Sequence, residues 1–166
     1  GATFIHVADQ SFGQFSYRKE STHMSIKKTG SAVWEGSLKE GKGQVSTESG
    51  VIKDVPYSFA KRFEGESGSN PEELIGAAHA SCYSMALSMI MGEAGLTPER
   101  ISTEAAVSLE QDSGGFSITK IHLTTRVRSP GTDDAAFQEA AGKAKEGCPV
   151  SKLFKAEITL DAALEN

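Results

Sequence analysis

The chain is poor in cysteine: its 166 residues contain two, Cys82 and Cys148. Two thiols without a C-x-x-C spacing exclude the simplest thioredoxin-like redox motif and an ordinary four-thiolate zinc site. A permanent disulfide between them is disfavoured in a reducing compartment. Three interpretations stay open, namely inert buried thiols, metal ligands, or a reversible redox pair.

The chain also lacks a concentrated basic run and a long uninterrupted apolar run. Lys and Arg are scattered and the formal net charge is −5, which argues against a nucleic-acid partner. The longest apolar region is interrupted by polar residues, namely His79, Ser81, Ser84 and Ser88. No stretch combines the basic start, apolar middle and cleavage site of a signal peptide. We therefore expect a cytoplasmic protein without a membrane span.

The length and the apolar content are typical of a single soluble domain. The first 23 residues are treated apart, because His23 and Met24 match a common cloning junction before a native start. We interpret residues 1–23 as a vector-derived or flexible N-terminal arm. Residues 24–166 then form the one domain.

The order of predicted elements indicates an α+β fold. Residues 31–64 read as an antiparallel meander, since "SAVWEG", "GQVSTES" and "PYSFAKRF" are separated by turn residues. Residues 71–92 predict a long helix that Asn70 caps, that Pro71 begins and that Gly95 stops. The remaining elements are strands at 103–111 and 116–129 joined by a hairpin, a helix at 133–146, a short helix after Cys148, and a strand at 156–164.

The long helix is apolar on most of its surface. One stripe follows steps of three and four residues, through Leu74, Ala78, Cys82, Met85 and Met89. Other faces are apolar as well, so we expect the helix to be enclosed on nearly all sides. A chain of this size has few elements for that purpose, which favours a homodimer with a continuous core over burial within one subunit.

Several residues near the thiols carry possible chemistry. Cys148 stands at a helix start, where amide donors lower the pKa of a thiol. Arg62 lies at the end of a predicted strand just before the long helix, close enough in sequence for a tertiary contact. His79 precedes Cys82 by three residues, a spacing that suits a metal pair or a base beside a nucleophile. No further metal ligands are evident, so a packed core histidine is the simpler interpretation.

Three segments resemble the OsmC/Ohr family of thiol-dependent peroxidases, and within it the OsmC branch. They are "WEGSLKEGKGQVSTESG", "RFEGESGSNPEELIGAAHASCYSMALS" and "GCPVSKLFKAEITL". The resemblance runs from about Ser25 to Leu164. It implies an OsmC-like fold of antiparallel sheets with two long helices, an intertwined homodimer with two sites at its interface, and reduction of organic hydroperoxides and hydrogen peroxide.

The resemblance also implies a role for each site residue. Cys82 is the attacking cysteine and Cys148 the resolving one, while Glu72 and Arg62 are the family's glutamate and arginine. It implies no cofactor and no metal, with an external dithiol as reductant. The alternative is a redox-sensing or ligand-binding dimer whose disulfide signals without turnover.

The spacing of Glu72 and Cys82 adds a geometric condition. They are ten residues apart, which on one straight helix is a rise of roughly 15 Å. A glutamate side chain cannot span that distance. If both residues serve one site, the helix begins later, or it bends, or the partner subunit supplies Glu72, and we favour the partner subunit.

Overall fold

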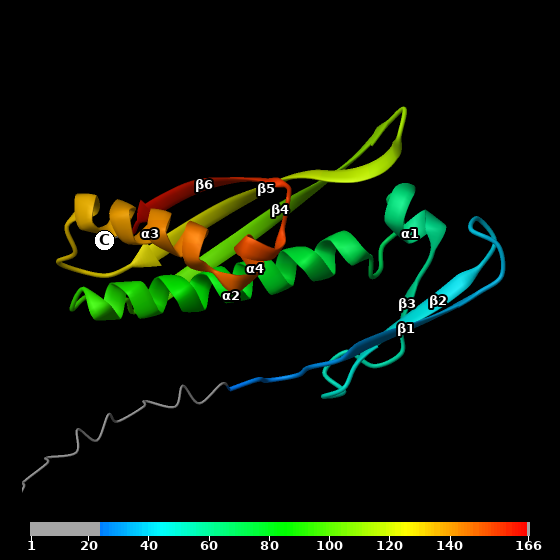
Figure 1. Ribbon diagram of the computed structural model, residues 1–166, viewed down its shortest axis with the longest axis horizontal. Coiled ribbons are helices and arrows are strands. Elements are labelled where there is room, and N and C mark those ends of the chain that lie inside the picture. The colour runs from blue at the N-terminus through cyan, green and yellow to red at the C-terminus, as the bar shows by residue number, and fades with distance from the viewer. Residues whose placement is uncertain (1–23, 166) are drawn as a thin grey trace, which may run out of the picture.

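The structure, a computed structural model, describes residues 24–165, and the expected arm at residues 1–23 lies outside them. The first described elements are β1 (Gly30–Glu35), β2 (Lys42–Thr47), β3 (Val55–Tyr57), α1 (Phe59–Phe63) and α2 (Pro71–Glu93). The others are β4 (Arg100–Asp112), β5 (Gly115–Arg128), α3 (Asp134–Gly147), α4 (Pro149–Leu153) and β6 (Glu157–Leu164). Figure 1 shows the resulting α+β arrangement, which confirms the predicted fold class.

The first sheet has the order β1-β2-β3 with antiparallel pairs, which is the predicted meander. The prediction of a strand through Phe63 is wrong, however, because the strand ends at Tyr57 and α1 follows. The Ser58 side chain accepts a hydrogen bond from the Lys61 amide at 3.2 Å. This N-cap bond starts a helix where the apolar pattern alone favoured a strand.

The second sheet has the order β4-β5-β6 and is mixed. β4 and β5 form the predicted antiparallel hairpin, in which the Asp112 carboxylate accepts a hydrogen bond from the Gly114 amide at 2.7 Å. β6 pairs in parallel with β5, so the expectation of wholly antiparallel sheets is wrong for this pair. The reason is that α3 and α4 carry the chain back to the starting end of β5, as a parallel crossover requires.

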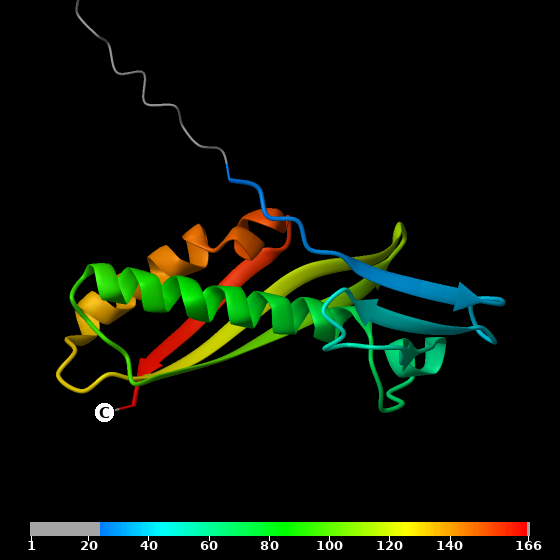
Figure 2. The same ribbon diagram turned by 90° about the horizontal axis from the view of Figure 1, so that it is seen from below.

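α2 and α3 pack side by side against one face of the second sheet (Figures 1 and 2). The observed bounds of α2 agree with the prediction, and the Asn70 side chain accepts from the Glu73 amide at 2.8 Å. The buried face of α2 carries Gly76, His79, Tyr83, Leu87 and Met91. Of these, Tyr83, Leu87 and Met91 belong to the core cluster of buried residues, which β5 and α3 complete with residues that include Leu123, Val127, Phe137 and Ala141.

The opposite face of α2 is uncovered in the single chain. Met85 and Met89 are 76% and 59% exposed, so one chain does not enclose the helix on all sides. Among residues 24–165, α2 is also the helix that is long and apolar enough to cross a membrane, by length and composition only. A core helix of a soluble protein meets the same criterion, and one side of α2 does form the core.

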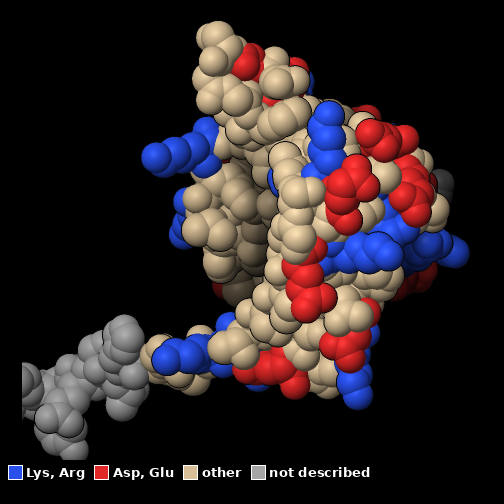
Figure 3. Space-filling model, turned by 90° about the vertical axis from the view of Figure 1, so that its right-hand side faces the viewer, with Lys and Arg blue, Asp and Glu red and all other residues tan. Residues whose placement is uncertain are grey.

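The first sheet stands apart from the layer formed by α2 and the second sheet (Figures 1 and 2). Between them lies a cavity of about 660 Å³. One wall comes from β1, β2 and the turn after β2, and the other from Leu74, Ala77, Ala78 and Ser81 of α2. The face drawn in Figure 3 is hollowed, and charged side chains gather outside the hollow rather than on its walls.

Two glycines allow a test of the packing between α2 and β4. A Cβ at Gly76 would lie 2.8 Å from the Ala105 carbonyl oxygen, whereas a Cβ at Gly142 of α3 would meet no atom within 4 Å. We expect Gly76→Ala to lower the free energy of unfolding by roughly 1–3 kcal/mol through overpacking. Gly142→Ala should raise it by about 0.5–1 kcal/mol through helix propensity. Urea unfolding measures both, and equal effects of the two substitutions would contradict the close approach of α2 to β4.

Candidate active site

Cys82 and Cys148 are brought together in one chain. Cys82 is partly buried on α2, and Cys148 is fully buried where α3 ends and α4 begins. The Cys148 amide donates to the Ala144 carbonyl at 2.9 Å and so closes the last turn of α3. Pro149 then begins α4. Both thiols are free, and they lie close enough to share a hydrogen bond.

The surroundings of Cys82 favour its neutral form. Burial raises the pKa of the Cys82 thiol, and the hydrogen bond and charge of Cys148 raise it further. The Val150 amide acts in the opposite direction, because it donates to the Cys82 sulfur and lowers its pKa. The first turn of α4 therefore directs an amide toward Cys82, while Cys148, as N-cap, makes no side-chain capping bond.

Arg62 and Glu72 form a second pair, close to the start of α2. The Arg62 Nη2 donates to Glu72 Oε1 at 2.6 Å, and its Nε lies 3.2 Å from both carboxylate oxygens. The side chains are 34% and 12% exposed. Exposed ion pairs contribute little, but this one uses the fork of the guanidinium and a largely buried carboxylate. The geometry fixes the direction of the Arg62 side chain.

The two pairs do not meet within the described chain. Arg62 comes from α1 rather than from a strand end, and its hydrogen bonds go to Glu72. No hydrogen bond or ion pair joins Arg62 to Cys82 among residues 24–165. The separation follows from the ten residues of helix between Glu72 and Cys82, which rise by roughly 15 Å. One chain thus holds two halves of the expected site.

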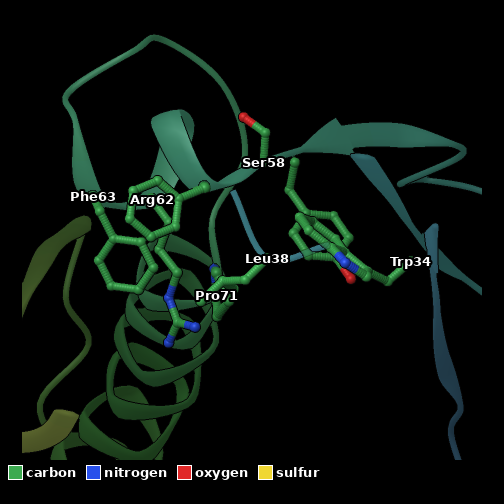
Figure 4. Close-up of a pocket in the computed structure, with 8 residues that line it drawn as sticks. Trp34, Leu38, Ser58, Arg62, Phe63 and Pro71 are labelled. Atoms are coloured by element: carbon green, nitrogen blue, oxygen red, sulfur yellow. The ribbon is translucent and has the colours of Figure 1, made fainter. Parts of the chain in front are cut away.

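An apolar pocket adjoins Arg62 (Figure 4). It has a volume of about 230 Å³. Its lining consists of Trp34, Leu38, Tyr57, Ser58, Phe59, Arg62, Phe63 and Pro71. Trp34 faces Arg62 and Phe63 across the pocket, and the guanidinium extends toward the start of α2. The Arg62 charge also lies 5.1 Å from the centre of the Phe63 ring. The pocket therefore provides an apolar space beside the Arg62 guanidinium, whose position is fixed by Glu72.

His79 has a structural partner that the sequence did not reveal. Its Nε2 hydrogen-bonds to the Ser151 hydroxyl of α4 at 2.7 Å, and both residues are buried. Phe154 packs edge-on against the imidazole, with ring centres 5.4 Å apart. The buried Nδ1 has no hydrogen-bond partner among residues 24–165, which costs about 1–3 kcal/mol, and burial lowers the pKa of His79. Ser151 lies 72 residues away in sequence, so no local signal identified it.

The contacts of His79 are those of a packed core residue, as the simpler interpretation of the sequence expected. No three His, Cys, Asp or Glu side chains in the described part of the chain are grouped so as to hold a metal ion.

Comparison with known proteins gives consistent matches. Residues 64–163 match the family of OsmC-like proteins. The peroxiredoxin OsmC of Escherichia coli K12 is 59% identical over 143 residues, which are 86% of this chain and all of that protein. The organic hydroperoxide resistance protein OhrB of Bacillus subtilis 168 is 30% identical over 74% of this chain and 89% of its own length. A crystal structure of B. subtilis OhrB aligns with a TM-score of 0.59 at 28% identity, over 82% of this chain and 98% of that one.

The thiol pair allows a test of its electrostatics. We expect Cys148→Ala to lower the pKa of Cys82, since the hydrogen bond and the charge of Cys148 both raise it while the Val150 amide remains. The rate of Cys82 alkylation by iodoacetamide against pH measures the change. The alkylated Cys82 is identified by mass spectrometry of its peptide. A midpoint that stays in place or rises would contradict the contact between the two sulfurs.

Proposed function

The chain belongs to the OsmC family, and we propose that it is a thiol peroxidase that reduces organic hydroperoxides and hydrogen peroxide with Cys82 and Cys148. The adjacency of these two sulfurs is the observation that carries the proposal. The relatives named peroxiredoxin and organic hydroperoxide resistance protein support it. An external dithiol would complete each turnover, which suits the reducing cytoplasm.

The cycle follows from the chemistry of a paired thiol. The Cys82 thiolate attacks the terminal oxygen of the peroxide, the O–O bond breaks, and an alcohol or water leaves after taking up a proton. Cys82 becomes a sulfenic acid. The Cys148 sulfur then attacks the Cys82 sulfur, so that an S–S bond forms and the hydroxyl leaves as water with the Cys148 proton. The external dithiol reduces the disulfide.

Arg62 and Glu72 would supply the electrostatics that the thiol pair lacks. Burial and Cys148 hold the Cys82 pKa high, and a nearby guanidinium would favour the thiolate by charge and by hydrogen bonds. Arg62 has donors left after its two-pronged contact with Glu72, because the guanidinium has five N–H groups. Glu72 would hold the fork in one direction, and the free donors would face the thiolate and the peroxide.

A second copy of the chain is the proposed source of that pair, as part of a homodimer. In a two-fold, antiparallel packing of α2 against its copy, Glu72 lies level with the partner's Cys82 if the helices cross at the residue midway between them. That residue is Ala77. Ala77, Ala78 and Ser81 are small and exposed, so they permit close helix approach. They also line the large cavity beneath the first sheet, which leaves room for the partner.

The pocket beside Arg62 would take the organic group of the peroxide. Aromatic and aliphatic side chains dominate its lining, which suits an alkyl or aryl substituent better than a charged one. Four apolar residues near the site residues in sequence are Met85, Met89, Phe63 and Phe154. Phe63 does line this pocket, whereas Phe154 packs on His79, and Met85 and Met89 are exposed.

Peroxide turnover tests the proposed activity. Cumene hydroperoxide and hydrogen peroxide are supplied with dithiothreitol, and peroxide consumption is measured for wild type and variants. We expect Cys82→Ser to abolish turnover, because the substitution removes the sulfur that attacks the peroxide. We expect Cys148→Ser to form the sulfenic acid once and then to recycle poorly.

Unchanged turnover by Cys82→Ser would overturn the assignment of the nucleophile. Formation of the Cys82–Cys148 disulfide without sustained peroxide consumption would indicate the redox-sensing dimer instead. Ser88→Ala, a change on an exposed face of the same helix, is the control.

Subunit complementation tests the origin of Arg62. Cys82→Ser and Arg62→Ala chains, each inactive alone, are mixed in equal amounts in urea and refolded together. Random pairing makes about half of the dimers mixed, each with one site that has both wild-type residues, so we expect about a quarter of wild-type activity. A mixture as inactive as its components would show that Arg62 and Cys82 of the same chain act together, or that the chains do not pair.

A further inference from the structure

α4 is tied to α2 by two side-chain bridges of different kinds. Cys82 meets Cys148, and His79 meets Ser151. On each helix the two partners are three residues apart, which is about one turn. The chain runs from His79 to Cys82 on α2, whereas their partners follow in the opposite order, from Ser151 back to Cys148. The two helices therefore run antiparallel at this point. The hydrogen bond therefore lies one turn from the sulfur pair on both elements.

The hydrogen bond is well placed to control the position of Cys148. α4 is five residues long, too short to hold its own orientation. Cys148, Ser151 and Phe154 follow steps of three, and the last two both contact the imidazole of His79. The His79 ring therefore holds Ser151 and Phe154 in place, and Cys148, which contacts Cys82, is the N-cap of the same short helix.

Packing alone does not explain why two polar side chains, His79 and Ser151, form the buried contact between α2 and α4. His79 is wholly buried and its Nδ1 has no hydrogen-bond partner in the part of the chain that the structure describes, so an apolar side chain would avoid an unsatisfied group at this position. A hydrogen bond gives what an apolar contact does not, namely one distance and one direction between the two helices.

We propose that the hydrogen bond between His79 and Ser151 is a positioning device that keeps the Cys148 sulfur within bonding reach of oxidised Cys82. The inference rests on the proposed peroxidase cycle and concerns its second step. In that step the Cys148 sulfur bonds to the Cys82 sulfur, the S–O bond of the sulfenic acid breaks, and water leaves with the thiol proton. Neither His79 nor Ser151 exchanges electrons or bonds, so both act through Cys148.

A competing reaction makes the position of Cys148 consequential. A Cys82 sulfenic acid that waits too long reacts with a second peroxide, which adds an oxygen to give the sulfinic acid and releases an alcohol. The fraction lost in this way depends on how fast Cys148 attacks. Removing the hydrogen bond should leave the first attack on peroxide unchanged and slow the second step.

The test compares variants of the full chain. Ser151→Ala and His79→Leu each remove the hydrogen bond, whereas His79→Gln keeps a polar group at similar reach. The matched control is Thr159→Val, because Thr159 forms the chain's other described histidine–hydroxyl bond, to His122 Nδ1 at 2.6 Å across β5 and β6. Circular dichroism and thermal unfolding verify that each variant is folded.

Four readouts follow the thiols. The rate of Cys82 thiol loss with one equivalent of cumene hydroperoxide reports the first step, and we expect it within about twofold of wild type in all variants. Disulfide formation should slow about tenfold in Ser151→Ala and His79→Leu, with more sulfinic acid by mass spectrometry at excess peroxide. Equilibration with a dithiol buffer should give a less negative disulfide potential, by about 30 mV for each tenfold loss in the equilibrium constant. His79→Gln should fall between these variants and wild type, and Thr159→Val should match wild type.

The proposal would be overturned if folded Ser151→Ala kept the rates, the sulfinic acid fraction and the disulfide potential of wild type. It would also be overturned if Thr159→Val changed these quantities as much as Ser151→Ala does. If only one of the two removing variants folds, that variant decides the outcome. Failure of the proposed function is distinguishable, because wild type would then consume no peroxide while the dithiol equilibrium still compares the variants.

Discussion

The close placement of two sulfurs from separate elements is the constraint on which the rest of the structure depends. Cys82 belongs to a helix packed on the second sheet, and Cys148 to the junction of two other helices. That junction stays in place because α3 is fastened to α2, in part by the Tyr83 hydroxyl, which donates to the Ala141 carbonyl at 3.3 Å. The crossover that makes β6 parallel to β5 carries α3 and α4 along the length of α2. The topology of the sheet thus serves the pairing of the thiols.

Local signals in the sequence predicted much of the fold, because they act over a few residues. Asn70, Pro71 and Gly95 gave the limits of α2 nearly to the residue, and the turn after Asp112 gave the hairpin. α1 was missed since its capping residue, Ser58, lies within an alternating pattern typical of a strand. The parallel placement of β6 was missed as well, because strand direction depends on the path of the whole crossover.

The candidate site was predictable to a different degree. The resemblance to a known family supplied all four residues, and the helix geometry indicated that Glu72 and Cys82 of one chain could not meet. The structure adds that Arg62 belongs with Glu72, so that the site divides into a thiol half and a cationic half. The contact of His79 with Ser151 was beyond sequence reasoning, since the two residues are 72 positions apart on different helices and the spacing of His79 to Cys82 does not point to Ser151.

This division has a chemical consequence. Within one chain, burial and the neighbouring thiol raise the pKa of Cys82, and the Val150 amide offsets them in part. A lone subunit would therefore hold Cys82 mainly as the thiol, which is a poor nucleophile toward peroxide. The cation that would reverse this balance is the Arg62 guanidinium. Glu72 binds it in the first turn of α2, too far from Cys82 of the same chain. Under the proposed pairing, association would bring cation and thiol together in the step that covers the apolar face of α2. The reactive Cys82 thiolate would then form only where the apolar pocket beside Arg62 and the sulfur of Cys148 are already adjacent to it.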